Sequence, residues 1–209
     1  MWLLPMTTTC LPDVSTLYRS NNSKSINSNL IYAITGDNYG NLWVGTTGNG
    51  LNYYNKSTGD FKHYLHDKND PKTIANNHIN VLYKDKKDML WVGTADGLDL
   101  VDLKTAKDSI KFKHFNLVND KISDNLSKND VYSIFEDSQN QLWVGGAKGL
   151  FKLSRDENGT IYFRLINNLI NIPNYTAVQS ITEDNQSNIW FGTYRNGLWV
   201  YNTKKDVFK

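Results

Sequence analysis

The stretch VQSITEDNQSNIWFGT (residues 178–193) decides the fold, because its landmarks recur three more times along the chain. Four short segments align on a tryptophan at intervals of about 50 residues: Leu42–Thr46, Leu90–Thr94, Leu142–Gly146 and Ile189–Thr193. Internal repetition at such a period is typical of solenoids and propellers. The repeat therefore has to be interpreted before any single residue.

Further landmarks surround each tryptophan in a fixed order. An aspartate stands six residues before it, a Gly-Leu pair follows it, and an aromatic-basic pair comes later. The aspartates are Asp37, Asp85, Asp137 and Asp184; the Gly-Leu pairs begin at Gly50, Gly97, Gly149 and Gly197; the last pairs begin at Phe61, Phe112, Phe163 and Phe208. Four landmarks repeated four times exclude coincidence.

Each unit predicts four short strands. The first, for example 131–135, is apolar on both faces, as expected of a strand buried on both sides. The aspartate then opens a tight turn by accepting backbone N–H groups. In the tryptophan strand, the glycine two residues after the tryptophan faces the same side and leaves room for a bulky ring from a neighbouring sheet. The Gly-Leu pair starts the third strand, and the aromatic-basic pair marks the half-exposed fourth.

An all-β fold of β-propeller blades follows, with four repeats of four antiparallel strands. Helical repeats would show apolar residues at i, i+3, i+4 and i+7, and these segments do not. Propellers have about four to eight blades. Four could close as a small ring, but the chain does not start and stop on repeat boundaries, which favours a segment of a larger propeller. An open arc would expose apolar faces at both ends.

Composition limits the function classes. The net charge of +2 does not suggest nucleic-acid binding. The single cysteine, Cys10, excludes an internal disulfide framework and a cysteine-based zinc cluster. No stretch approaches the roughly 20 apolar residues of a membrane span. The start lacks the positive region and long apolar core of a secretory signal.

We expect residues 1–16 to be an N-terminal extension, either disordered or a cloning remnant, and residues 17–209 to form the propeller segment. Within that segment, residues 17–29 are interpreted as the remnant of a preceding blade with its loop, because Leu17-Tyr18-Arg19 resembles a fourth strand. The blade repeats are expected at 30–65, 78–115, 130–166 and 177–209.

These repeats resemble the two-component regulator propeller family, whose blades read roughly V-x-x-I-x-x-D-x-x-G-x-[LI]-W-[VF]-G-T…G-[LI]-x-x-[YF]. Val178 to Tyr201 follows this pattern nearly in full. Two departures are Gly146 in place of threonine and a turn glycine kept only at Gly40. The resemblance implies a periplasmic glycan-sensing region of a Bacteroides-type hybrid two-component system. It also implies a histidine kinase beyond this chain, membrane attachment only through flanking regions, and the option of a homodimer formed by the full-length sensor.

Several catalytic and metal motifs are absent. The segment starting at Asp184 resembles an EF-hand start, but Ile189 and Arg195 stand where that loop needs glycine and glutamate. Glu136-Asp137 and Glu183-Asp184 repeat the turn rather than form an acid/base pair. No nucleophile motif or phosphate loop occurs. We therefore predict no catalytic residue, metal or cofactor.

Binding in loops fits better, because loops on a rigid scaffold commonly carry function. One set joins successive blades, at Asn21–Asn29, His66–Asn77, Asn116–Asn129 and Asn167–Thr176; the other joins second and third strands, at Thr46–Asn49, Thr94–Asp96, Gly146–Lys148 and Thr193–Asn196. Sugar recognition uses aromatic faces with amide and charged groups. The candidate ligand residues are Tyr194, Arg195, Asn196, Asn49, Asp96, Lys148, His78 and Tyr175.

Three hypotheses stay open: an extracytoplasmic glycan sensor, an enzyme of the streptogramin lyase type, and a protein-interaction scaffold. The lyase repeats resemble W-F-T-E, and the glutamate is absent after all four tryptophans. The sequence barely separates the sensor from the scaffold.

Overall fold

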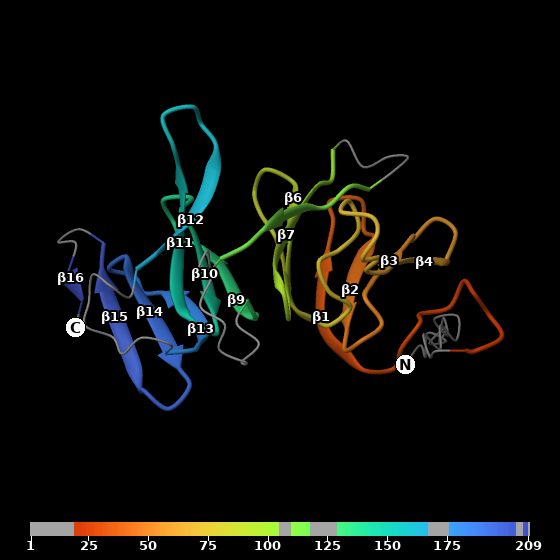
Figure 1. The fold of residues 1–209 in the computed structure, drawn as a ribbon, viewed down its shortest axis with the longest axis horizontal. Coiled ribbons are helices and arrows are strands. Elements are labelled where there is room, and N and C mark those ends of the chain that lie inside the picture. The colour runs from red at the N-terminus through yellow and green to blue at the C-terminus, as the bar shows by residue number, and fades with distance from the viewer. Residues whose placement is uncertain (1–18, 105–109, 118–128, 167–175, 204–206, 209) are drawn as a thin grey trace, which may run out of the picture.

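The computed structural model describes residues 19–104, 110–117, 129–166, 176–203 and 207–208. These residues form sixteen strands in four antiparallel four-stranded sheets and contain no helix (Figure 1). Each sheet is one repeat, with its strands in sequence order. The expectation of four blades with four strands each is confirmed.

The strands are as follows. Blade 1 contains β1 (Ile31–Gly36), β2 (Leu42–Thr46), β3 (Leu51–Tyr54) and β4 (Phe61–Tyr64); blade 2 contains β5 (Ile79–Lys84), β6 (Met89–Thr94), β7 (Gly97–Asp102) and β8 (Lys113–Phe115). Blade 3 contains β9 (Val131–Glu136), β10 (Leu142–Gly146), β11 (Gly149–Arg155) and β12 (Ile161–Leu165); blade 4 contains β13 (Val178–Glu183), β14 (Asn188–Thr193), β15 (Leu198–Asn202) and β16 (Val207–Phe208).

The apolar cores lie between consecutive blades. One core joins Trp43 and Leu51 of blade 1 to Ile79 and Leu82 of blade 2, and the next two repeat this arrangement along the arc. The first strands also follow one another, since β5 contacts β1 and β9, and β9 contacts β13. Blades therefore stabilise each other through nearest-neighbour contacts, as in other repeat proteins.

In blades 1 to 3 the glycine of the tryptophan strand makes this close packing feasible. A Cβ on Gly45 would lie 2.5 Å from Cγ2 of Ile79, and one on Gly93 would lie 2.7 Å from Cγ1 of Val131. The neighbouring group is thus a β-branched side chain from the next blade's first strand. The expectation that this glycine accommodates a bulky ring was wrong in that respect.

The aspartate turn is built as expected. In each blade one carboxylate oxygen accepts the backbone N–H groups two and four residues on; for Asp137 these are Gln139 at 2.9 Å and Gln141 at 2.8 Å. The second oxygen of Asp85, Asp137 and Asp184 accepts the indole N–H of that blade's tryptophan, at 2.8–3.0 Å. Asp and Trp therefore belong to the scaffold.

The end blades differ from the middle ones. In β1, Ile34 is 61% exposed, whereas its counterpart Leu82 in β5 is 8% exposed. At the other end Leu198 is 64% exposed, although its counterpart Leu150 is fully buried. The expectation that every first strand is buried on both sides was therefore wrong for β1 and for β13, where Gln179, Ser180 and Thr182 are exposed.

The expectations for the N-terminus lie largely outside the described residues. Residues 1–16 and the supposed strand at Leu17-Tyr18 are among the residues that the structure does not describe. Residues 19–30 form turns, and Lys24 accepts a backbone hydrogen bond from Phe61 of β4. The described part of this segment thus packs on blade 1 itself.

Candidate functional site

Two sets of connections meet on one face of the arc, which we call the loop face. The turns between second and third strands (residues 47–49, 95–96, 147–148 and 194–196) each donate a backbone N–H to a carbonyl just before that blade's first strand. The links are Thr47 to Leu30, Ala95 to His78, Ala147 to Asp130 and Tyr194 to Ala177, at 2.8–3.1 Å. In Figure 1 the loop face is the lower side of the molecule, where the β14–β15 turn can be seen.

Polar side chains gather where the first strands of blades 2 and 3 begin on the loop face. The Asp130 carboxylate lies near Asn80 of β5, Tyr132 of β9 and His78, and the polar groups of these three residues all lower its pKa. We call these residues the Asp130 cluster: His78, Asn80, Asp96, Asn129, Asp130 and Tyr132. Carboxylate, amide, imidazole and phenol groups side by side provide the donors and acceptors that hydroxyl-rich ligands need.

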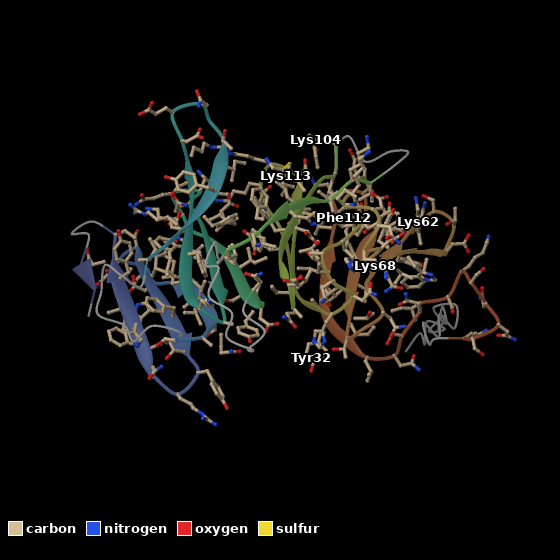
Figure 2. All side chains as sticks on the ribbon, viewed as in Figure 1. Tyr32, Lys62, Lys68, Lys104, Phe112 and Lys113 are labelled. Atoms are coloured by element: carbon tan, nitrogen blue, oxygen red, sulfur yellow. The ribbon has the colours of Figure 1, made fainter. Side chains whose placement is uncertain are left out.

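Contacts extend the cluster to blade 1. The Nε2 atom of His78 lies 3.3 Å from Oγ1 of Thr47, and the His78 ring meets the exposed ring of Tyr32 edge-on at 5.7 Å. Asn129 donates to Asp96 at 3.2 Å. Figure 2 shows Tyr32 at the lower side of the molecule. Three blades therefore contribute to one surface.

Burial sets the charge properties of the cluster. It raises the pKa of the Asp130 carboxyl, against the hydrogen bonds from Asn80 and Tyr132 and the attraction of His78. Burial also raises the pKa of the Tyr132 phenol, helped by the charge of Asp130. A half-buried carboxylate that binds neutral donors is the kind of group that a sugar hydroxyl can reach.

The blade 4 turn holds three predicted ligand residues next to one another. The Arg195 guanidinium lies over the Tyr194 ring at 4.8 Å, and Asn196 donates to Thr176 at 2.9 Å. Arg195 has a φ of 71°, in the left-handed region that a side chain adopts at a cost. All three side chains are exposed.

The remaining predicted residues are dispersed. Asn49 is exposed on the blade 1 turn, where its carbonyl accepts a bond from Asn27 at 2.7 Å. Lys148 is buried in the blade 3 turn. Tyr175 lies outside the described residues. Of the eight predicted residues, the structure thus brings His78 and Asp96 into the Asp130 cluster.

Sequence reasoning missed Asn80, Asn129, Asp130, Tyr132 and Tyr32. Tyr32, Asn80 and Tyr132 hold equivalent positions, one residue into each first strand. A comparison of these equivalent positions would have shown that they are polar or aromatic in an otherwise apolar strand. That is the signal available in the sequence.

In blades 1 and 2, one side chain from the third strand and one from the fourth hold the segment that precedes the first strand; we call this pair the polar clasp. Asp99 is fully buried and accepts from the Ala75 N–H at 2.8 Å and pairs with His114, whose other nitrogen lies 2.7 Å from the Pro71 carbonyl. In blade 1 Asn52 and His63 hold Asn27 and Ser25 in the same way. His63 and His114 thus have structural roles.

Within the described ranges, no group of three His, Cys, Asp or Glu residues could hold a metal ion. Nor does that part of the chain include a helix with the length and apolarity needed to cross a membrane.

A family profile described as "Two component regulator propeller" matches four segments, at residues 25–48, 73–96, 125–148 and 171–195. The comparison with curated proteins finds no match. Each matched segment runs from the inter-blade loop through the tryptophan strand, so the profile covers both the scaffold landmarks and part of the loop face.

Solved structures show the same architecture. The extracellular domain assigned to a hybrid two component system of B. thetaiotaomicron is 25% identical, with a TM-score of 0.66 over 87% of this chain and 25% of that one. A second such domain from that organism is 22% identical, with a TM-score of 0.51 over 93% and 30%. The chain thus spans about a quarter to a third of the length of these relatives.

An enzyme shares the fold at lower identity. Virginiamycin B lyase from Staphylococcus aureus, solved with quinupristin, is 16% identical, with a TM-score of 0.60 over 92% of this chain and 57% of the lyase. At that identity the likeness is one of blade architecture.

Proposed function

Because the chain belongs to the two component regulator propeller family, we propose that it is part of the extracytoplasmic sensing region of a hybrid two-component signalling protein and binds an oligosaccharide on its loop face. The Asp130 cluster carries this proposal, since it joins polar and aromatic groups from three blades on one surface. The likeness to extracellular domains of such systems supports the location outside the cytoplasm.

The chemistry of the cluster suits a hydroxyl-rich ligand. Asp130 and Asp96 offer acceptors, Asn80 and Asn129 offer amides, and Tyr32 offers an exposed ring against which a sugar can pack. The groups sit at the ends of strands or in short turns tied by backbone bonds, so they are held in place before a ligand binds. Preorganisation of this kind lowers the cost of binding.

Calorimetric titration of the chain with a panel of neutral and acidic oligosaccharides tests the proposal. Asp130→Asn removes the central charge, and we expect it to weaken binding by about tenfold or more, as for a hydrogen bond to a charged group. Asp156→Asn is the matched control, because Asp156 lies in the β11–β12 turn on the opposite face. Absence of heat with every sugar, or equal effects of the two variants, would contradict the proposal.

We assign no reaction to this chain. The lyase is similar in blade architecture, but the glutamate of the lyase repeat pattern is absent here. Turnover in a lyase substrate screen that is lost on His78→Ala would instead favour an enzyme. Capture of a macromolecular partner without any sugar binding would favour a scaffold.

A further inference from the structure

A pocket opens on the face opposite the loop face, between blades 1 and 2. This turn face carries the aspartate turns (residues 37–41, 85–89, 137–141 and 184–188). The pocket has a volume of about 450 Å³, within the usual range for small-molecule sites. Its lining includes Trp43, Tyr53, Tyr64, Lys62, Leu103 and Lys104.

The ring packing beside this pocket differs from that at the next blade junction. At the blade 2–3 junction Phe163 of β12 packs on both Trp91 and Phe115, at 5.9 and 5.5 Å between ring centres. The equivalent Phe112 precedes β8, which spans only Lys113–Phe115, and among the described rings it meets Tyr64 alone. Trp43 instead packs on Tyr53 and Tyr64 of its own blade, at 4.6 and 5.9 Å between ring centres.

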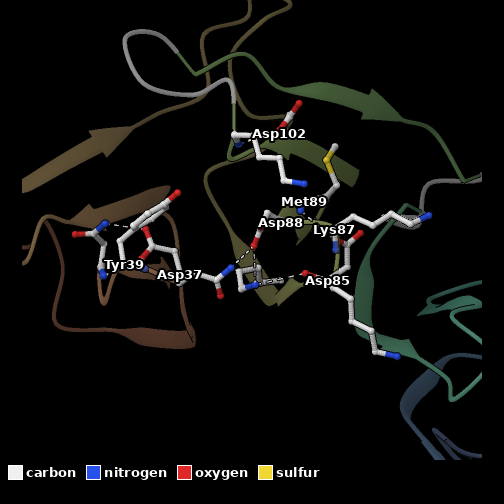
Figure 3. A network of polar contacts seen from close by, with 12 residues as sticks. Asp37, Tyr39, Asp85, Lys87, Asp88, Met89 and Asp102 are labelled. Carbon is white, nitrogen blue, oxygen red and sulfur yellow. Dashed lines mark hydrogen bonds and ion pairs between the residues drawn. The ribbon is translucent and has the colours of Figure 1, made fainter.

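One wall of the pocket is a fixed polar bridge. Asn38 donates to Asp88, which also accepts from Lys84 at 3.1 Å, so the turns of blades 1 and 2 are joined (Figure 3). Asp37 accepts from two backbone N–H groups and from the Asn41 amide. The two lining carboxylates therefore already have hydrogen-bond donors.

Trp43 supplies an unused donor. Its side chain is 2% exposed, and its indole Nε1 has no hydrogen-bond partner among the described residues. The equivalent N–H groups in the other three blades point at their turn aspartates, and Asp37 lines this pocket together with Trp43. A buried N–H without a partner is costly, and a ligand acceptor would remove that cost.

Two ammonium groups also line the pocket, and that of Lys62 lies over the Tyr64 ring at 5.2 Å. Within the described part of the chain, neither Lys62 nor Lys104 pairs with a carboxylate. Burial raises the pKa of Tyr64 to about 12 and raises that of Tyr53, so both phenols keep their protons at neutral pH. Figure 2 shows Lys62 and Lys104 on the side opposite Tyr32. The two ammonium groups are thus available to an anion, while the Asp37 and Asp88 carboxylates are engaged by donors of the chain.

We propose that this pocket binds a small carboxylate carried on a six-membered ring. The anion would accept from the Trp43 N–H and the two ammonium groups, and the ring would lie against Tyr53, Leu103 and Ile110. A carboxylate would accept from the unpartnered Trp43 N–H and from the ammonium groups, and charge-assisted bonds are the stronger ones. The ring could belong to an aromatic acid or to an acidic sugar, and the titration below distinguishes the two.

Titration of the full chain with benzoate and with glucuronate, each against its neutral counterpart benzyl alcohol or glucose, tests the site by calorimetry and tryptophan fluorescence. We expect one acid to bind and its neutral counterpart to bind at least about tenfold more weakly. The acid that binds identifies the ring class. Failure of both acids to bind, or equal binding of acid and neutral compound, would overturn the proposal.

Substitutions of the lining residues test whether the acid binds in this pocket. Trp43→Phe removes only the N–H and a ring edge, and should weaken binding about tenfold; Lys62→Gln combined with Lys104→Gln should do so at least as strongly. Trp91→Phe is the matched control and should leave affinity unchanged, as should Asp130→Asn on the loop face. Unchanged affinity in Trp43→Phe and in the double lysine variant would overturn the assignment. Because the two faces are tested with different variants, failure here leaves the oligosaccharide proposal standing, and the reverse also holds.

Discussion

Blade 2 lies between two other blades, whereas blade 1 has a neighbour on one side only among the described residues. The same repeat position is therefore core in one blade and surface in the other: Leu82 is buried and Ile34 is exposed. The strand sequences do not reveal this difference, since both positions are aliphatic. Burial in a repeat protein depends on the adjacent repeat as much as on the residue.

Leu82→Ala should produce the largest effect. Removing a buried leucine costs about 2–5 kcal/mol through lost apolar contact and the cavity left behind. Ile34→Ala should change the free energy of unfolding by no more than about 0.5 kcal/mol, as surface substitutions usually do. Urea unfolding followed by circular dichroism measures both. Similar costs at the two positions would show that β1 is covered in solution, for example by a second copy of the chain.

The tryptophans of blades 1 and 2 differ in one hydrogen bond, that of the indole N–H. Trp91 donates to the buried Asp85 at 3.0 Å, whereas the Trp43 N–H has no partner among the described residues. Both phenylalanine variants lose the same ring volume, so the difference between them isolates the bond. Trp91→Phe should cost about 1–2 kcal/mol more in unfolding free energy than Trp43→Phe, because it leaves a buried acceptor unpaired.

The same two variants can also contradict the absence of a partner for the Trp43 N–H. If Trp43→Phe destabilises as much as Trp91→Phe, the Trp43 N–H has a partner in solution within the chain itself. The pocket on the turn face would then lose its buried donor.

Much of the scaffold could be predicted because each landmark acts within one repeat. The aspartate reaches N–H groups two and four residues on, so its spacing alone predicts the turn. The Gly-Leu pair likewise begins the third strand in blades 2 and 3. Local geometry of this kind recurs wherever the residues recur.

The candidate sites depend on contacts between blades and were predicted poorly. Asp130 becomes central only because Asn80 and His78 come from the previous blade. The turn-face pocket depends on where β8 starts relative to Phe112, which the aromatic-basic pattern does not reveal. Residues about 50 apart in sequence meet across a blade junction, and a single sequence does not give the geometry of that junction.

The polar clasp offers a pH-dependent comparison, because blade 2 uses Asp99 where blade 1 uses Asn52. Hydrogen bonding to Asp99 raises the pKa of His114 above its ordinary value of 6.5, and burial raises the pKa of Asp99. Both shifts mean that the folded chain holds protons more tightly than the unfolded one. The contribution of His114 to stability is fully present below the ordinary pKa of histidine and is lost as pH rises through its raised value.

Asp99→Asn makes blade 2 resemble blade 1 at this position. We expect the wild-type free energy of unfolding to fall as the pH rises above about 6.5, and the fall to be smaller in Asp99→Asn. Urea midpoints across that range measure it. His114→Gln is the control and should reduce the same pH dependence; an unchanged profile in both variants would show that the pair does not titrate there.

The smallest effect concerns the aspartate turns themselves, which all place their fourth residue in the left-handed region. Gly40 has a φ of 83°, and its counterparts Asp88, Asn140 and Ser187 have φ values of 61–64°. Asp and Asn tolerate this conformation better than serine does. Ser187→Gly should therefore stabilise the chain by up to about 1 kcal/mol, less the entropy that glycine loses on folding. Gly40→Ser should destabilise it by a similar amount, and thermal midpoints measure both. If Ser187→Gly destabilises instead, blade 4 gains more from side-chain order in its turn than it loses to backbone strain, and its turn differs from that of blade 1 in more than sequence.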